Sequence, residues 1–151
     1  MNTTDMKRYE SSKWNFALDI PRSWNSFPPV PTNSPYEVIR FASREDGIHV
    51  LIIFREPPNP GQSLKQHSDQ IQQVLAGKSF GNFATVETTI RSKAVLMLDF
   101  DKPQGDGIWS CRHYFFAEGA PGYTLGFGTT NKAVMFELCD RMAKSFEILA
   151  K

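Results

Sequence analysis

Cys111 and His113 are the residues whose types and spacing come closest to a catalytic pair. They lie two positions apart in an alternating stretch, so a β-strand would point both side chains to the same face. A thiolate beside an imidazole can act as a nucleophile when a third group orients the imidazole. Apolar Trp109 and Phe115 flank the pair on that face, and we find no oxyanion-hole signature nearby. The pattern favours packing, or a hydrogen-bonded histidine, over a nucleophile.

The three histidines, His49, His67 and His113, do not form a metal-binding pattern. A zinc site needs roughly three or four ligands that converge from separate elements. Apart from Cys111 beside His113, no histidine lies at ligand spacing from another His, Cys or carboxylate. We therefore predict no metal site, and we expect His67 at the edge of the apolar stripe of a helix.

Two neighbouring carboxylates, Asp99 and Asp101, are expected on one strand face, opposite Leu98 and Phe100. Paired carboxylates can perform acid–base catalysis, but they more often mark a solvated strand end. The Gly-x-Ser-x-Gly, His-Glu-x-x-His and P-loop motifs are missing from the sequence. We therefore predict no catalytic residue and no cofactor site, and we expect that the protein is not an enzyme.

Residues 126–131, Gly-Phe-Gly-Thr-Thr-Asn, form the motif that most resembles an anion site. A strand that passes through Gly-x-Gly into a helix N-terminus can present free N–H groups to a phosphate or carboxylate. The dinucleotide-binding pattern needs a third glycine, and Asn131 stands there instead. The simpler interpretation is that the glycines let the helix pack close to the sheet and that a threonine caps it.

Length and composition predict one globular domain over residues 1–151. Hydrophobic residues make up 40% and charged residues 22%, which is typical of a soluble protein with a single core. The formal charge of +1 gives no argument for binding nucleic acid. The N-terminus has no apolar signal region and no run could span a bilayer, so we expect a cytoplasmic protein. A chain trimmed of an export signal would look the same.

The two cysteines, Cys111 and Cys139, are expected on a strand and on the last helix. Free Cys behaves as a small hydrophobic residue, so two buried free thiols are the simpler interpretation. A disulfide that joins helix to sheet is the alternative, because distance cannot be inferred from sequence.

Alternating apolar residues predict strands, and turn residues set their limits. We predict strands at 9–20 (as a strand or hairpin), 36–43, 48–54, 83–91, 94–101, 109–116 and 123–127. The proline-rich stretch 27–35 is predicted as an ordered loop or a crossing at the sheet edge. Turns are expected at 45–47, 92–93, 102–107 and 118–122.

Two helices are predicted. Ser63 and Gln66 form a capping box at the start of the first helix, and Gly77 is a plausible stop. Thr130 or Asn131 caps the second. The expected apolar stripes are Leu64, His67, Ile71, Val74 and Leu75 in the first helix, and Val134, Leu138, Met142, Phe146 and Leu149 in the second.

These elements predict an α+β fold in which helices pack on the faces of an antiparallel sheet. Strands joined by short turns must run antiparallel. The near-continuous apolar strand at 48–54 indicates a central strand covered on both faces. We therefore expect an α/β/α sandwich with one helix on each face of the sheet.

Two segments resemble the Mog1/PsbP-like superfamily. Residues 16–24, Phe-Ala-Leu-Asp-Ile-Pro-Arg-Ser-Trp, are similar to its opening pattern of alternating apolar residues followed by Pro-x-x-Trp. Residues 123–130, followed by a helix that ends in Lys144-Ser145-Phe146, are similar to its closing strand and helix. Members include the nuclear Ran-binding protein Mog1, the PsbP subunits of photosystem II and bacterial domains of unknown function. The resemblance implies a compact, non-enzymatic accessory or adaptor domain without a shared catalytic set.

The sequence therefore predicts a domain that binds a protein partner of unknown identity. Trp24, Phe27 and Tyr36 around the proline-rich loop are the candidate partner-binding residues, since aromatic residues are enriched in contact patches. The alternative for these residues is that they fix the loop to the sheet edge. The alternative function is a small-molecule or lipid carrier with a pocket between the sheet and the last helix. Its expected lining is Trp109, Tyr114 or Phe116.

Overall fold

A computed structural model describes residues 5–57, 61–116 and 122–149. Its centre is a seven-stranded sheet in the order β3-β4-β5-β9-β8-β7-β6, in which every neighbouring pair is antiparallel. The strands of this sheet are β3 (Asn25–Phe27), β4 (Glu37–Ser43), β5 (His49–Glu56), β6 (Gly81–Ile90), β7 (Lys93–Gln104), β8 (Gly107–Phe116) and β9 (Gly122–Thr129).

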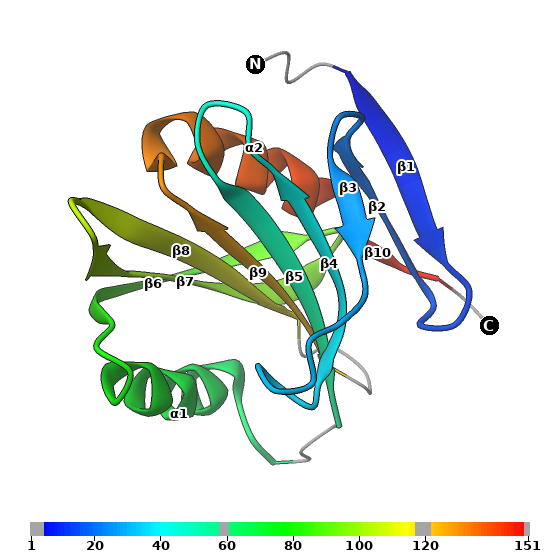
Figure 1. The fold of residues 1–151 in the computed structure, drawn as a ribbon. Coiled ribbons are helices and arrows are strands. Elements are labelled where there is room, and N and C mark those ends of the chain that lie inside the picture. Colours follow the sequence, from blue (N-terminus) through cyan, green and yellow to red (C-terminus); the bar gives the residue numbers. More distant parts are fainter. Residues whose placement is uncertain (1–4, 58–60, 117–121, 150–151) are drawn as a thin grey trace.

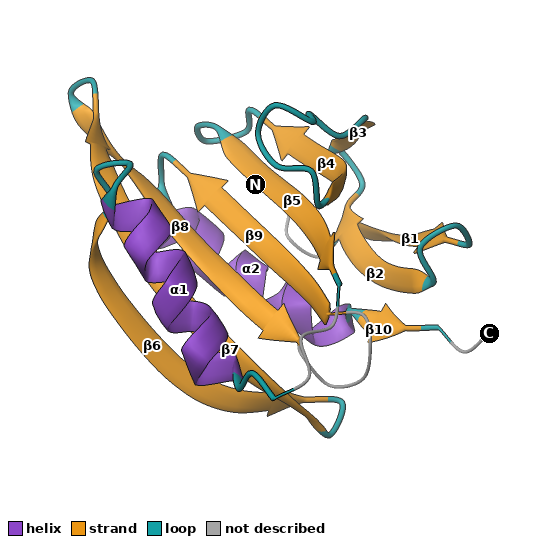
Figure 2. Cartoon of the chain, turned by 90° about the horizontal axis from the view of Figure 1, so that it is seen from below, coloured by secondary structure: helices purple, strands orange, loops and turns teal. Residues whose placement is uncertain are grey.

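The two helices lie on opposite faces of this sheet (Figure 2). Helix α1 (Leu64–Ala76) packs on β6, β7 and β8, and helix α2 (Lys132–Ser145) packs on β8 and β9. Each face has its own hydrophobic cluster. Leu98, Phe100 and Phe115 lie under α1, whereas Leu125, Phe127 and Leu138 belong to the larger cluster around α2. The predicted α+β fold with an α/β/α arrangement is confirmed.

A second, three-stranded sheet is built from β1 (Met6–Ser11), β2 (Phe16–Pro21) and β10 (Glu147–Ile148). Figure 1 shows β1 and β2 beside the edge of the main sheet that carries β3 and β4. The predicted hairpin at 9–20 is confirmed, with Tyr9 opposite Leu18. The sequence did not predict the small sheet, because β10 is only two residues long and pairs with a strand from the other end of the chain.

The local turn and cap signals predict several boundaries correctly. Ser63 and Gln66 exchange the two hydrogen bonds of a capping box at the start of α1, and Gly77 caps its end. Asp46 and Gly47 adopt positive φ angles in the β4–β5 hairpin, as an Asp-Gly turn requires. These signals need only a few neighbouring residues, so they do not depend on the rest of the fold.

The predicted loop at 102–107 is wrong in extent. Strand β7 continues to Gln104 and β8 begins at Gly107, so only Gly105 and Asp106 form the turn. Pro103 pairs opposite Ile108 near the end of the long β7–β8 ribbon. Proline has no backbone N–H, and at this position the missing hydrogen bond has little effect on the sheet. The turn predicted at 118–122 lies largely outside the described residues.

The second helix begins where it was predicted to begin, but it ends before the last residue of its predicted apolar stripe. Asn131 is the N-cap but makes no capping bond through its side chain, and the helix ends at Ser145 before the chain turns into β10. Leu138, Met142 and Phe146 are buried as expected, while Val134 and Leu149 are only half-buried. Met135 and Cys139 are buried in their place, because α2 is enclosed by β2 as well as by the sheet.

Strand β5 lies in the middle of the sheet, but its two faces are covered unequally. His49, Leu51 and Ile53 face the α2 side and are buried. Val50, Ile52 and Phe54 face the α1 side and remain half-exposed. The expectation that helices cover both faces of this strand is therefore wrong for one face, and that difference creates the site described next.

Candidate ligand-binding site

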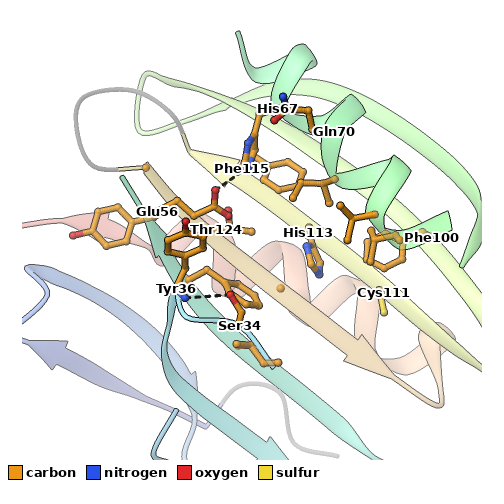
Figure 3. A pocket seen from close by; sticks show the side chains of 18 of the residues that line it. Ser34, Tyr36, Glu56, His67, Gln70, Phe100, Cys111, His113, Phe115 and Thr124 are labelled. Carbon is orange, nitrogen blue, oxygen red and sulfur yellow. Dashed lines mark hydrogen bonds and ion pairs between the residues drawn. The ribbon is translucent and has the colours of Figure 1, made fainter. Parts of the chain in front are cut away.

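A hollow of about 1200 Å³ lies between α1 and the part of the sheet that α1 does not cover. Its floor is formed by β5, β9 and β8, and α1 forms one wall (Figure 3). Tyr36 and Ser34, which precede β4, stand on the side away from the helix. Most side chains that line the floor are aliphatic or aromatic, with a few polar groups among them.

The floor consists of rows of residues that lie opposite one another across the three strands. The successive rows are Val50–Gly128–Cys111, Ile52–Gly126–His113 and Phe54–Thr124–Phe115, and Glu56 and Gly122 form the last. From Val50 to Glu56 the strand advances about 20 Å. The hollow is therefore elongated along the strands. On β5 it is apolar from Val50 to Phe54 and polar at Glu56, and Lys78, just after the end of α1, also lines it.

The two glycines of the Gly-Phe-Gly motif make room for side chains of β8. A Cβ on Gly128 would lie 2.3 Å from Cζ2 of Trp109, and one on Gly126 would lie 2.9 Å from Nε2 of His113. Both glycines face α1, since Phe127 between them is buried in the cluster around α2. The motif thus shapes the hollow on the α1 face, and the expectation that its glycines bring α2 close to the sheet is wrong.

His113 lies in the floor of the hollow among aromatic rings. The ring centroids of Phe100, Phe115 and Phe54 lie 4.9, 6.0 and 6.2 Å from that of His113. Burial lowers the pKa of His113 to about 4, so its imidazole is neutral at pH 7. Within the described residues it makes no hydrogen bond to the protein. Of the two expected alternatives, packing and a hydrogen-bonded histidine, the ring contacts therefore confirm packing.

At the polar end of the hollow, a histidine of the helix lies against a carboxylate of the sheet. Nε2 of His67 lies 3.7 Å from Oε2 of Glu56, and both side chains are partly exposed. Figure 3 shows this pair beside Gln70, with the hydroxyl-bearing Thr124 deeper on the floor. His67 also packs edge-on against Phe115, so the expectation that it lies at the margin of the helix stripe is confirmed.

The two cysteines lie on opposite faces of the sheet and are free. The predicted alternative of a disulfide is therefore excluded, and the interpretation as buried thiols is confirmed. Burial raises the pKa of Cys111 to about 12 and that of Cys139 well above its usual value. A thiol that stays protonated beside a neutral imidazole is a poor nucleophile, which agrees with the expectation of packing rather than catalysis.

The two candidate carboxylates have structural partners. Asp99 accepts two hydrogen bonds from Arg112 across the β7–β8 ladder, and Asp101 accepts one from Asn82. Arg112 also donates to Asp140 of α2, which the hydroxyl of Tyr114 contacts as well. Among the described residues, no group of His, Cys, Asp and Glu is arranged to hold a metal ion.

The three predicted partner-binding residues occupy different environments. Trp24 is fully buried against His49, so it supports the loop from inside and is not part of the surface. Phe27 and Tyr36 are 47% and 42% exposed, and Tyr36 also borders the hollow. A role of Phe27 and Tyr36 in partner binding stays a prediction.

A buried carboxylate, rather than the aromatic side chains alone, holds the proline-rich loop. Glu37 accepts hydrogen bonds from the backbone N–H of Val30 and from the side chains of Asn33 and Arg40. Burial opposes the charge of Glu37, but these hydrogen bonds outweigh it and lower its pKa. Sequence reasoning missed this anchor, because Val30 and Glu37 are seven residues apart in a segment without a periodic pattern.

The hollow lies under the first helix. The carrier alternative had expected a pocket under the last helix. Trp109 and Phe116 do line the hollow, but Tyr114 does not and contacts Asp140 of α2 instead. One signal in the sequence could have located it. Residues 48–54 are apolar on both faces. Helix α1 is a single helix of 13 residues, and it packs on β6, β7 and β8 rather than on this strand. An apolar strand face without a helix to cover it indicates a hollow.

The comparisons with known proteins concern the fold. No family model matches the sequence, and none of the curated proteins matches it. The solution structure of the cyanobacterial PsbP protein CyanoP from Synechocystis sp. PCC 6803 matches 95% of this chain and 92% of its own, with a TM-score of 0.72 and 15% identity. The chain has the PsbP-like fold. The predicted resemblance to the Mog1/PsbP-like superfamily is thus confirmed for the fold.

Two further solved structures share this PsbP-like arrangement. LpqN of Mycobacterium tuberculosis, described as involved in cell envelope biogenesis, matches 96% of this chain and 91% of its own, with a TM-score of 0.62 and 8% identity. The protein of unknown function PA94 from Pseudomonas aeruginosa matches 93% and 94%, with a TM-score of 0.57 and 13% identity. At these identities the likeness concerns the fold alone.

No helix in the described ranges is long and apolar enough to cross a membrane.

Proposed function

We propose that this chain is a non-enzymatic binding domain that carries an elongated apolar small molecule in the hollow between α1 and the sheet. The observation that supports this function is the hollow itself, with its volume of about 1200 Å³. Ligand sites are typically concave, mostly apolar and furnished with a few polar groups that fix orientation. Val50, Ile52 and Phe54 supply the apolar surface, and Glu56 and His67 supply a polar end.

The apolar floor gives a physical reason for binding. Burying apolar surface contributes roughly 25 cal/mol per Å², so an aliphatic chain along the half-exposed side chains of β5 gains affinity from most of its length.

A cytoplasmic location, expected from the N-terminal residues, stays a prediction.

A fluorescence titration with N-phenyl-1-naphthylamine, an uncharged apolar probe, tests this proposal. We expect saturable binding to the wild-type protein. The substitution Ile52→Trp fills the middle of the hollow and should weaken binding at least about tenfold, because the probe then competes with the indole for the same space.

A matched variant separates this effect from a general effect of an added tryptophan. Val86→Trp adds the same side chain to β6, where Val86 is 57% exposed and does not line the hollow. It should bind the probe as the wild type does. Equal binding by Ile52→Trp and the wild type, or no saturable binding by the wild type, would contradict the proposal.

A second candidate function is the binding of a protein partner through the proline-rich loop. Phe27, Val30 and Tyr36 are large, exposed hydrophobic residues within ten positions of one another. Exposed hydrophobic groups that cluster on a surface often mark interaction sites. The loop is also held in one conformation by Glu37, which reduces the entropy lost on binding.

The substitution Phe27→Ala distinguishes the two functions. Phe27 is exposed and does not line the hollow, so its loss should leave probe binding unchanged. It should reduce the recovery of a stoichiometric partner in a pull-down from the native host by about tenfold, as the loss of an aromatic anchor does. A partner that is recovered equally by both proteins would remove Phe27 from this surface.

A further inference from the structure

His113 is a polar side chain without a protein partner in the middle of the apolar hollow. It makes no hydrogen bond within the described parts of the chain, and Phe54, Phe100 and Phe115 surround its ring. The neighbouring titratable group on the same strand face is the thiol of Cys111, and the Glu56–His67 pair lies at the polar end. Because His113 is only partly buried and lines the hollow, a molecule inside the hollow can supply the hydrogen-bond partner that the protein does not.

The fold accommodates this histidine at a cost to the opposite strand. Gly126 lies directly across from His113 in the β8–β9 ladder, and a Cβ there would lie 2.9 Å from Nε2 of His113 and 3.1 Å from Cε2 of Phe54. A glycine within a strand gives up packing and backbone rigidity. An aliphatic residue in place of His113 would pack against the three rings without an unpaired polar group. The arrangement is therefore suited to interaction with something inside the hollow.

The state of the ring defines the chemistry of its partner. Because burial keeps the pKa of His113 at about 4, the imidazole is neutral near pH 7, and it can donate one hydrogen bond and accept another. A neutral imidazole among aromatic rings offers no countercharge to a carboxylate or an ammonium group. A hydroxyl or carbonyl group matches it, since such a group needs a hydrogen bond and carries no charge.

We propose that His113 is a specificity-determining residue that hydrogen-bonds an uncharged hydroxyl or carbonyl group partway along the apolar ligand. This inference rests on the proposed carrier function and defines the class of ligand more closely. The row of His113 lies four residues, or about 14 Å, along β5 from the row of Glu56. The ligand is thus a long chain whose polar end lies near Glu56 and His67 and which bears a second polar group along its length.

Two esters that differ by a single hydroxyl provide the test. Methyl stearate and methyl 12-hydroxystearate both have an uncharged end, and only the second carries a hydroxyl far along its chain. Each would displace N-phenyl-1-naphthylamine from the wild-type protein. We expect the hydroxylated ester to bind about tenfold more tightly, which is the effect of a net buried hydrogen bond.

Two matched substitutions assign the preference to one residue. His113→Phe keeps an aromatic ring of similar size but removes both nitrogens, and it should abolish or reverse the preference. Val86→Phe introduces the same side chain on β6, where Val86 is 57% exposed and does not line the hollow, and should retain the preference. A preference that survives in His113→Phe would overturn the inference.

The comparison of the two esters in the wild type decides the inference even if His113→Phe does not fold. Equal affinity for both esters, with the probe still bound, would overturn the role of His113 and leave the carrier function intact. No binding of the probe or of either ester would overturn the carrier function and this inference together.

Discussion

At the scale of single residues, Gly128 shows how closely strand β9 approaches its neighbours. A Cβ on this residue would lie 2.3 Å from Cζ2 and 2.8 Å from Cε2 of the Trp109 ring. Real Cβ atoms do not come so close, so Gly128→Ala must displace the indole or the strands. We expect it to lower the free energy of unfolding by about 1–3 kcal/mol, which is typical of overpacking. Urea denaturation measures the loss.

Gly107→Ala is the matched control for this substitution. It adds the same methyl group at the start of β8, where the nearest atom to the new Cβ is 3.9 Å away. We expect a change within about 0.5 kcal/mol. If both variants unfold at the same urea concentration, the close contact between Gly128 and Trp109 is not a constraint on the fold.

Because the pKa of His113 is lowered in the folded protein, we predict that the free energy of unfolding depends on pH. The unfolded chain protonates this histidine near its usual pKa of 6.5, whereas the folded chain does so only near 4. The unfolded state therefore binds more protons between these values, and the free energy of unfolding falls as the pH drops from about 6.5 to 4. Above pH 6.5 the residue contributes no dependence. The full loss is up to about 3 kcal/mol.

Urea denaturation of the wild type and His113→Phe between pH 7 and 4 measures this contribution. Other acidic groups, such as Glu37, titrate in both proteins and cancel in the difference. We expect the difference between the two free energies to be constant above pH 6.5 and to change below it. A difference that stays constant down to pH 4 would show that His113 is freely solvated in the folded protein.

At the scale of elements, Arg112 connects three of them. Its guanidinium donates two hydrogen bonds to Asp99 of β7, at 2.8 and 2.9 Å, and one to Asp140 of α2, at 3.0 Å. It also lies 4.3 Å from the centre of the Phe136 ring. Because the arginine is largely buried, Arg112→Gln should lower the free energy of unfolding by about 1–3 kcal/mol.

An exposed ion pair of the same type serves as the control for Arg112. Arg22 donates to Asp5 at 3.0 Å, but both side chains are more than half exposed. Exposed pairs contribute little, so we expect Arg22→Gln to change the free energy of unfolding by less than about 0.5 kcal/mol. Thermal or urea unfolding of both variants makes the comparison. Equal losses would mean that the network around Arg112 does not join α2 to the sheet.

The elements that the sequence predicts well are those with local signals. The capping box at Ser63 and the Asp46-Gly47 turn need only a few residues in sequence, and both are found as expected. The elements that it missed depend on distant contacts. Strand β10 exists because Glu147 and Ile148 reach Ala17 and Phe16 of β2. The buried stripe of α2 is shifted because β2 covers a side of the helix that the sequence pattern assigns to solvent.

At the scale of the whole molecule, the hollow could be predicted only in part. The sequence shows a strand that is apolar on both faces and a first helix with a single stripe. It does not show which strands that helix packs on. The structure places α1 over β6, β7 and β8, which leaves the α1 face of β5 and β9 open. His113 and Trp109 were identified as strand residues of one face, but their relation to Gly126 and Gly128 depends on the register between β8 and β9.

The hollow also predicts that a ligand stabilises the whole fold. The rows from Val50 to Glu56 come together only in the folded sheet, so a bound molecule favours the folded state over the unfolded one. At a free ligand concentration of about 100 times Kd, the gain is about 2.7 kcal/mol, which for a chain of this length raises Tm by about 5–10 °C. Thermal unfolding with methyl 12-hydroxystearate measures the shift, and methyl stearate at the same concentration should give a smaller one. Ile52→Trp should show no shift, because its indole occupies the site. If Tm rises equally in that variant, the ester binds elsewhere on the molecule.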